Sequence, residues 1–225
     1  MKKTIVLCIC LFLFCFMETA FSEVIYSIDF AKVKETTPEE WLKNNKFTFK
    51  LDADDLRFRF ENNALLIDNA GDINGLLYKE IDIKNVKRVR IEWGVNKYSP
   101  GVDWENGMTR DSISIIISFG RKKISSGSLI IPDVPYFIGI FLGEKEIDNK
   151  PYEGRYYKKG GRYICTPCNS PAGKTVITDF EIHDRFLQLF DEKEVPPISA
   201  ISIETDTRDL QSAEAYIRKI EFLSN

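Results

Sequence analysis

Apolar and polar side chains alternate along much of the chain, which is the pattern of half-buried β-strands. Residues 56–60, 89–95 and 113–119 each place apolar side chains at every second position. The segments 198–205 and 215–223 supply two more strands near the end of the chain. Residues 136–142 are apolar throughout and predict a central strand covered on both faces.

Helix signals are confined to two short segments. Thr37-Pro38-Glu39-Glu40 forms a capping box with proline at the first helical position. Apolar residues recur at helical spacing in residues 183–193. Many strands and two short helices predict a mainly all-β fold, an antiparallel β-sandwich of jelly-roll type with two short helices.

The N-terminus has the organisation of a signal peptide. Lys2 and Lys3 precede an apolar run that ends at Met17, too short for a membrane-spanning helix. We expect cleavage after Ser22, giving a signal peptide of residues 1–22 and a single domain of residues 23–225. A lipoprotein or an uncleaved anchor is less favoured, because the residue before Cys15 is large. The chain is therefore expected in the periplasm or outside the cell, with no membrane span after cleavage.

The charge of the chain argues against nucleic acid as a partner. The net charge is −3 for 225 residues, and no basic block is present that would follow a phosphate backbone. No linker, repeat or low-complexity segment divides the chain. The oligomeric state does not follow from the sequence.

Cys165 and Cys168 are the only cysteines outside the signal peptide, and they form the single CxxC of the chain. A redox couple requires a helix after the motif, but the next residues favour a turn. A zinc site requires further cysteine or histidine ligands, and the chain has one histidine. In an oxidising compartment the spacing favours a local disulfide on a hairpin or loop, with free thiols as the alternative.

Two long stretches resemble the domain of unknown function 3047 family, a group of exported bacterial proteins. Residues 91–120 resemble the family's tryptophan-containing strand, its proline-containing loop and its next strand, and residues 198–222 resemble its terminal strand, acidic loop and last strand. This chain departs from the family in two places. Its acidic loop, residues 206–209, contains Arg208 and no glycine. The acidic pair that the family has before the next strand is here Arg110-Asp111. The resemblance implies the sandwich and the export but no activity. More distantly, the pattern is similar to galactose-binding-type sandwiches, many of which bind carbohydrate.

Trp104 lies in a polar, turn-rich segment and is the first candidate ligand-binding residue. Pyranose rings stack on exposed aromatic rings while their hydroxyls find polar partners. Asp103, Glu105, Asn106 and Asp111 supply such partners. The alternative is a loop indole folded back onto the edge of the sandwich.

A second candidate surface contains Tyr156 and Tyr157, which are followed by two lysines. This surface suits an anionic glycan or a protein of the cell envelope. Here too the alternative is a set of aromatic residues that pack back onto the fold.

Glu204, Asp206 and Asp209 form the third candidate site. A continuing strand would put Glu204 and Asp206 on one face, where oxygen ligands suit calcium or where an acid and base pair would act on a sugar. The third interpretation is an ordinary solvated strand end.

The sequence identifies no catalytic residue. His183 is read as a surface or capping residue, because no nucleophile motif accompanies it. The leading hypothesis is an exported, non-enzymatic β-sandwich that binds carbohydrate or cell-envelope glycan. The alternatives are an interaction or assembly factor of the envelope and, third, a glycoside hydrolase; calcium is the one candidate cofactor.

Overall fold

The computed structural model describes residues 23–33, 36–154 and 156–224. The signal peptide predicted for residues 1–22 and its cleavage at Ser22 lie outside the described residues. In the described part of the chain, no helix is long and apolar enough to cross a membrane.

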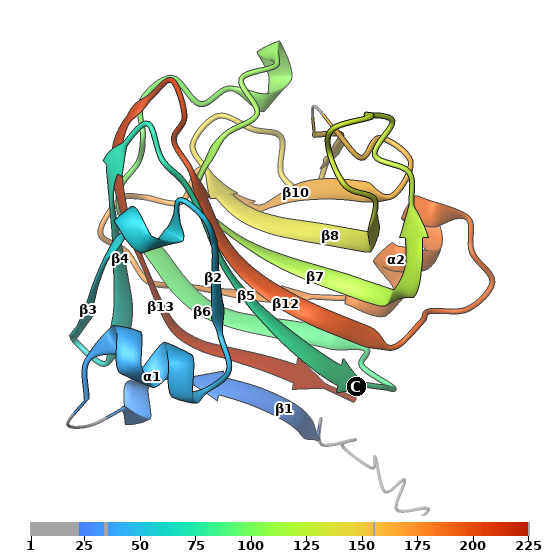
Figure 1. Ribbon diagram of the computed structural model, residues 1–225, viewed down its shortest axis with the longest axis horizontal. Helices are drawn as coiled ribbons and strands as arrows, with labels where there is room; N and C mark the ends of the chain where they lie inside the picture. The colour runs from blue at the N-terminus through green and yellow to red at the C-terminus, as the bar shows by residue number, and fades with distance from the viewer. Residues whose placement is uncertain (1–22, 34–35, 155, 225) are drawn as a thin grey trace, which may run out of the picture.

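Two stacked β-sheets form the fold, which confirms the predicted β-sandwich (Figure 1). In spatial order, the first sheet contains β11 (Val176–Phe180), β6 (Arg88–Lys97), β13 (Gln211–Leu223), β4 (Ala64–Gly71) and β3 (Arg57–Glu61), and β1 (Val24–Asp29) also pairs with β13. The second sheet contains β2 (Thr48–Leu51), β5 (Asn74–Ile83), β12 (Ile198–Asp206), β7 (Asp111–Ile124), β8 (Val134–Gly143), β10 (Gly161–Cys168) and β9 (Pro151–Tyr152).

The two predicted helices are present and begin where the sequence indicates. In α1 (Pro38–Asn44), the Thr37 hydroxyl accepts a hydrogen bond from the Glu40 amide at 3.3 Å, as a capping box requires. In α2 (Ile182–Phe190), Phe186 is fully buried against Phe119 of β7. Single 3-10 turns also occur at η1 (Phe30–Lys32), η2 (Ala53–Asp55) and η3 (Trp104–Asn106).

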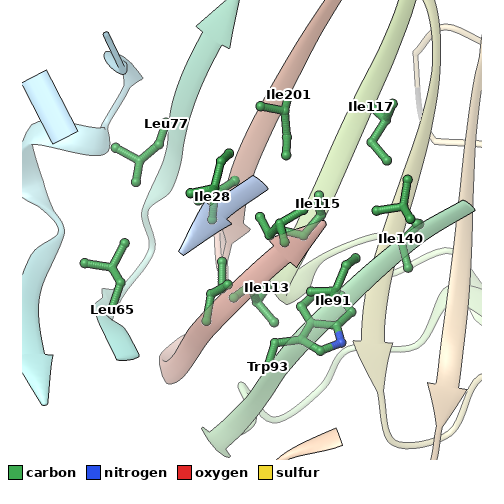
Figure 2. Close-up of a cluster of buried hydrophobic side chains, with 14 of the residues drawn as sticks. Ile28, Leu65, Leu77, Ile91, Trp93, Ile113, Ile115, Ile117, Ile140 and Ile201 are labelled. Atoms are coloured by element: carbon green, nitrogen blue, oxygen red, sulfur yellow. The ribbon is translucent and has the colours of Figure 1, made fainter. Parts of the chain in front are cut away.

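The core lies between the sheets and is built from the predicted inward-facing residues. Figure 2 shows isoleucines from β6, β7, β8 and β12 in one cluster with Trp93, whose side chain is fully buried. The Trp93 indole nitrogen donates to the Thr178 hydroxyl at 2.9 Å, so its one polar group is satisfied inside the core.

One strand pair departs from the antiparallel pattern. β10 runs parallel to β8, because the chain crosses back through residues 144–160 before it enters β10. The CxxC therefore lies within a strand, not on the hairpin or loop that the sequence suggested. The Cys165–Cys168 disulfide is formed, and a register shift separates the two cysteines in the pairing with β8.

Trp93→Ala is expected to lower the free energy of unfolding by about 3–5 kcal/mol, because it removes a large side chain from a closed core and one of the two hydrogen bonds of the Thr178 hydroxyl. Urea denaturation with tryptophan and far-ultraviolet readouts measures the change. The matched control is Ile177→Ala, on the neighbouring strand but 66% exposed, which should change stability by under about 0.5 kcal/mol. Equal losses in both variants would contradict the assignment of Trp93 to the core.

Candidate functional site

Three of the predicted carboxylates, Asp111, Glu204 and Asp206, meet on one face of the second sheet. Asp206 lies opposite Asp111 in the pairing of β12 with β7, and Glu204 lies opposite Ser114. Ile113 and Ile203 point into the core, so Ser114 and Glu204 point to the other face of the sheet, called here the outer face. We name Asp111, Glu204 and Asp206 the outer-face carboxylate cluster.

A register shift between β7 and β12 explains how Asp111 joins this cluster. By strict alternation Asp111 would follow Ile113 and Ile115 into the core. The pairing advances by two residues on β12, from Glu204 to Asp206, but by three on β7, from Ser114 to Asp111. The extra residue re-aims the end of the strand, as β-bulges do, and turns the Asp111 carboxyl toward the outer face.

The cluster is electrostatically strained. Asp111 is buried and its Oδ1 atom has no hydrogen-bond partner. Burial, followed by the charges of Glu204 and Asp206, raises the pKa of Asp111 well above its ordinary value. Burial and the charge of Asp206 raise the pKa of Glu204 to about 7. The Ser114 hydroxyl lies 3.4 Å from Glu204 Oε2 and opposes this rise.

Two arginines neutralise part of the negative charge. Arg208 donates from Nε and Nη2 to the two oxygens of Asp206, at 3.0 and 2.7 Å. Arg110 lies 3.5 Å from Asp206 and 3.3 Å from Asp209. A guanidinium that engages both oxygens of a carboxylate is the strongest form of such a pair.

Arg110 and Arg208 are the positive groups that contact Asp206, and Arg110 also contacts Asp209. Among residues 23–33, 36–154 and 156–224, no group of three or more histidine, cysteine or acidic side chains is arranged to hold a metal ion. Calcium binding by Glu204, Asp206 and Asp209 therefore stays a prediction, and the geometry favours neutralisation by arginine.

Trp104 is buried, so the expectation of an exposed indole is wrong and the alternative of an indole folded back onto the sandwich is confirmed. Its side chain is 6% exposed and stacks on Phe141 at 4.9 Å between ring centroids. Phe141 and Cys165 point to the outer face, where Trp104 and Tyr152 cover them. The burial of these apolar side chains draws the indole onto the sheet, and its ring nitrogen donates to the Arg110 carbonyl at 2.7 Å.

The polar neighbours of Trp104 are occupied within the fold. Asp103 caps the turn η3 by accepting from the amide and the side chain of Asn106, which lowers the pKa of Asp103. Glu105 accepts from Lys150 and from the Tyr152 hydroxyl, which lowers the pKa of Glu105. These groups hold the loop in place, so the structure does not place them around a stacked sugar.

Tyr163 joins the Trp104 loop to the carboxylate cluster, and the sequence reasoning missed it. Its ring lies 4.9 Å from the Trp104 ring and rests over Gly139, where a Cβ atom would approach within 2.6 Å of Tyr163. Burial, followed by Glu204, Asp111 and Asp206, raises the pKa of the phenol. The signal was present in the alternation of β10, in which Ile164 points inward and Tyr163 outward.

Tyr156 and Tyr157, the predicted second surface, lie in the segment next to Phe137, away from the Trp104 loop. Tyr157 is half-buried and packs edge-on against Phe137 at 5.7 Å. Burial raises the pKa of Tyr157, and the charge of Glu204 adds to this rise. Tyr156 is 38% exposed.

A cavity of about 500 Å³ lies at one end of the sandwich, and none of the carboxylate-cluster residues lines it. The turn between β5 and β6, the segment 195–198, Ser224 and His183 line it. His183 contacts Asp184 through Nδ1 at 2.8 Å and Lys87 through Nε2 at 3.2 Å. These contacts agree with a surface residue at the start of α2.

No protein-family model and no curated protein sequence matches the chain. Solved structures match over most of its length. The potassium-bound carbohydrate recognition domain of Emp46p is 10% identical, covers 89% of this chain and 97% of its own, and has a TM-score of 0.44. The CBM1 of BiXyn10A is 6% identical, with coverages of 90% and 99% and a TM-score of 0.36.

The glycoside hydrolase domain of Spr0440, Endo-D from Streptococcus pneumoniae R6, is 6% identical, with a TM-score of 0.37. The match covers 80% of this chain but only 22% of that structure. At these identities the likeness concerns the fold alone. The resemblance to the domain of unknown function 3047 family stays a prediction.

Glu204→Gln should reduce the pH dependence of stability. Because the pKa of Glu204 is about 7 in the folded state and near its ordinary 4.5 when unfolded, the native protein binds the extra proton in between. Stability should fall as pH rises from about 4.5 to about 7 in the wild type, by roughly 1–3 kcal/mol. Thermal melts across pH 4.5–8 measure this fall, which should be smaller in Glu204→Gln and unchanged in exposed Glu194→Gln. A wild-type curve that rises over this range would contradict it.

Proposed function

We propose that this chain is an exported, non-enzymatic β-sandwich that binds carbohydrate or cell-envelope glycan on the outer face of its second sheet. The observation that carries the proposal is that half-buried Glu204, the Asp206–Arg208 ion pair and Tyr163 lie on the same face of this sheet, beside Asp111.

Sugars require acceptors, donors and an apolar surface close together, because each hydroxyl both donates and accepts while the ring carbons are apolar. Glu204 supplies an acceptor, and Arg208, 47% exposed in its side chain, supplies donors. The aromatic surface is that of Tyr163, supported from behind by Trp104. Tyr163, rather than Trp104, is thus the aromatic residue on which we expect the sugar ring to stack. Trp104 positions Tyr163.

Binding is favoured over hydrolysis because the Asp206 carboxylate is already paired with Arg208. A hydrolytic pair needs one carboxylate free to attack or to activate water. Both oxygens of Asp206 accept hydrogen bonds from Arg208, and Arg110 lies beside them.

Arg208→Ala should weaken glycan binding by about 10- to 100-fold, because it removes charge-assisted hydrogen bonds to the ligand and frees Asp206. The ligand is first chosen on a glycan array with the wild-type protein, and the affinities are then measured by calorimetry. Arg90→Ala is the matched control, since it breaks a 2.6 Å ion pair with Asp179 on the other sheet. Wild-type protein that binds no glycan, or equal binding by Arg208→Ala, would refute the proposal.

A glycoside hydrolase is the second candidate, and the pKa of about 7 for Glu204 favours it, since a general acid needs a proton near neutral pH. If this second candidate is right, chromogenic glycosides should be cleaved by the wild type and at least about 100-fold more slowly by Glu204→Gln. Turnover that survives in Glu204→Gln would trace the activity to a contaminant. Binding without any turnover would leave the first proposal in place.

A further inference from the structure

The loop between β7 and β8 carries two adjacent aliphatic side chains that contact almost nothing in the protein. Leu129 has a relative exposure of 107% and Ile130 one of 93%, the highest among the exposed large apolar residues. Isolated apolar residues on a surface are ordinary, but a fully exposed pair at the tip of a loop is an uncovered apolar surface.

Hydrogen bonds within the loop hold this pair outward. The Ser128 hydroxyl accepts from the amides of Ile130 and Ile131, at 3.1 and 3.2 Å. The Ser126 amide donates to Asp133 at 2.9 Å, and the Ser126 hydroxyl donates to the Ile131 carbonyl at 2.7 Å. These bonds tie both sides of the tip together, so the aliphatic side chains are presented by a defined turn.

Basic residues surround the tip. Arg121, Lys122 and Lys123 are exposed at the end of β7, immediately before the loop. The segment 156–160 lies beside the loop (Figure 1), and its Lys158 and Lys159 are exposed.

Two contacts fix this arrangement. The Tyr157 amide donates to the Ser126 carbonyl at 3.4 Å. Gly160 packs closely on Ile124, since a Cβ atom added at Gly160 would lie 2.9 Å from the Ile124 side chain. Of the nearby acids, Glu153 pairs with Arg162 at 3.5 Å, whereas Asp133 accepts from the neutral Ser126 amide and keeps its charge, so the five basic side chains outnumber the acids. The patch is therefore positive on a chain whose net charge is −3.

We propose that Leu129 and Ile130 insert into the headgroup region of an anionic lipid surface, with the five basic residues in contact with lipid headgroups. Aliphatic tips flanked by lysine are suited to such surfaces, where each basic residue adds attraction and the apolar side chains enter the interface. Protein interfaces, in contrast, are poor in lysine and centre on tryptophan, tyrosine and arginine in pockets. The lipid surface thus fits both halves of the patch.

Vesicle co-sedimentation tests the proposal. The chain from Glu23 onward is used, since the strands that the structure describes lie within residues 24–223. It should sediment with vesicles of phosphatidylcholine containing 30% phosphatidylglycerol, bind pure phosphatidylcholine at least about tenfold more weakly, and dissociate in 0.5 M salt. The Lys158→Glu, Lys159→Glu double variant should lose at least about 25-fold in partitioning, at about fivefold per lysine removed.

The Leu129→Ser, Ile130→Ser double variant should bind at least about tenfold more weakly while keeping the wild-type melting temperature, because both side chains are outside the core. Ile177→Ser is the control for an exposed aliphatic residue elsewhere, and Lys32→Glu is the control for charge; both should bind as wild type.

Equal sedimentation of the loop double variant would exclude the tip as the contact. No sedimentation of the wild type would overturn the proposal, and so would photocrosslinking from position 129 to one envelope protein without any vesicle binding. Glycan affinity is measured separately, so failure here leaves the sugar-binding proposal intact.

Discussion

The packing of the two sheets around Trp93 and its isoleucine neighbours is the constraint on which the other features depend. Because side chains alternate along a strand, each apolar residue committed to this core sends its neighbours to the opposite face. The inward Ile113, Ile115 and Ile203 thereby fix Ser114 and Glu204 on the outer face of the second sheet. The position of the candidate site is a consequence of how the core is filled.

Keeping three carboxylates on this face is unfavourable for stability, and the surrounding groups offset only part of the cost. Arg110 and Arg208 stabilise the ionised Asp206, whereas Asp111 remains buried with an oxygen that has no partner. A fold optimised for stability alone would place apolar or amide side chains there. Strained groups of this kind concentrate at functional sites, which is why the cluster, rather than the better satisfied Asp103 turn, is the stronger candidate.

The sandwich, its inward-facing residues and both helices could be predicted because they follow from local patterns: alternation in 89–95 and 113–119, and the cap at Thr37. The site could be predicted only in part. The register shift that turns Asp111 outward depends on the pairing of β7 with β12, which no local pattern encodes. The burial of Trp104 depends on Phe141 and Tyr163, which reach it from distant strands. The parallel β8–β10 pair was hidden because alternation does not reveal strand direction.

The two proposed surfaces belong to the same side of the molecule, and Tyr157 connects them. Its ring packs on Phe137 of β8, on the outer face that carries the carboxylate cluster, and its segment lies next to the β7–β8 loop. Its amide also bonds to that loop through Ser126. A chain attached to lipid by Leu129 and Ile130 would therefore hold the outer face of the second sheet near the membrane surface. Glycans anchored in that membrane would be within closer reach than free sugars, and a weak site would gain from their high local concentration.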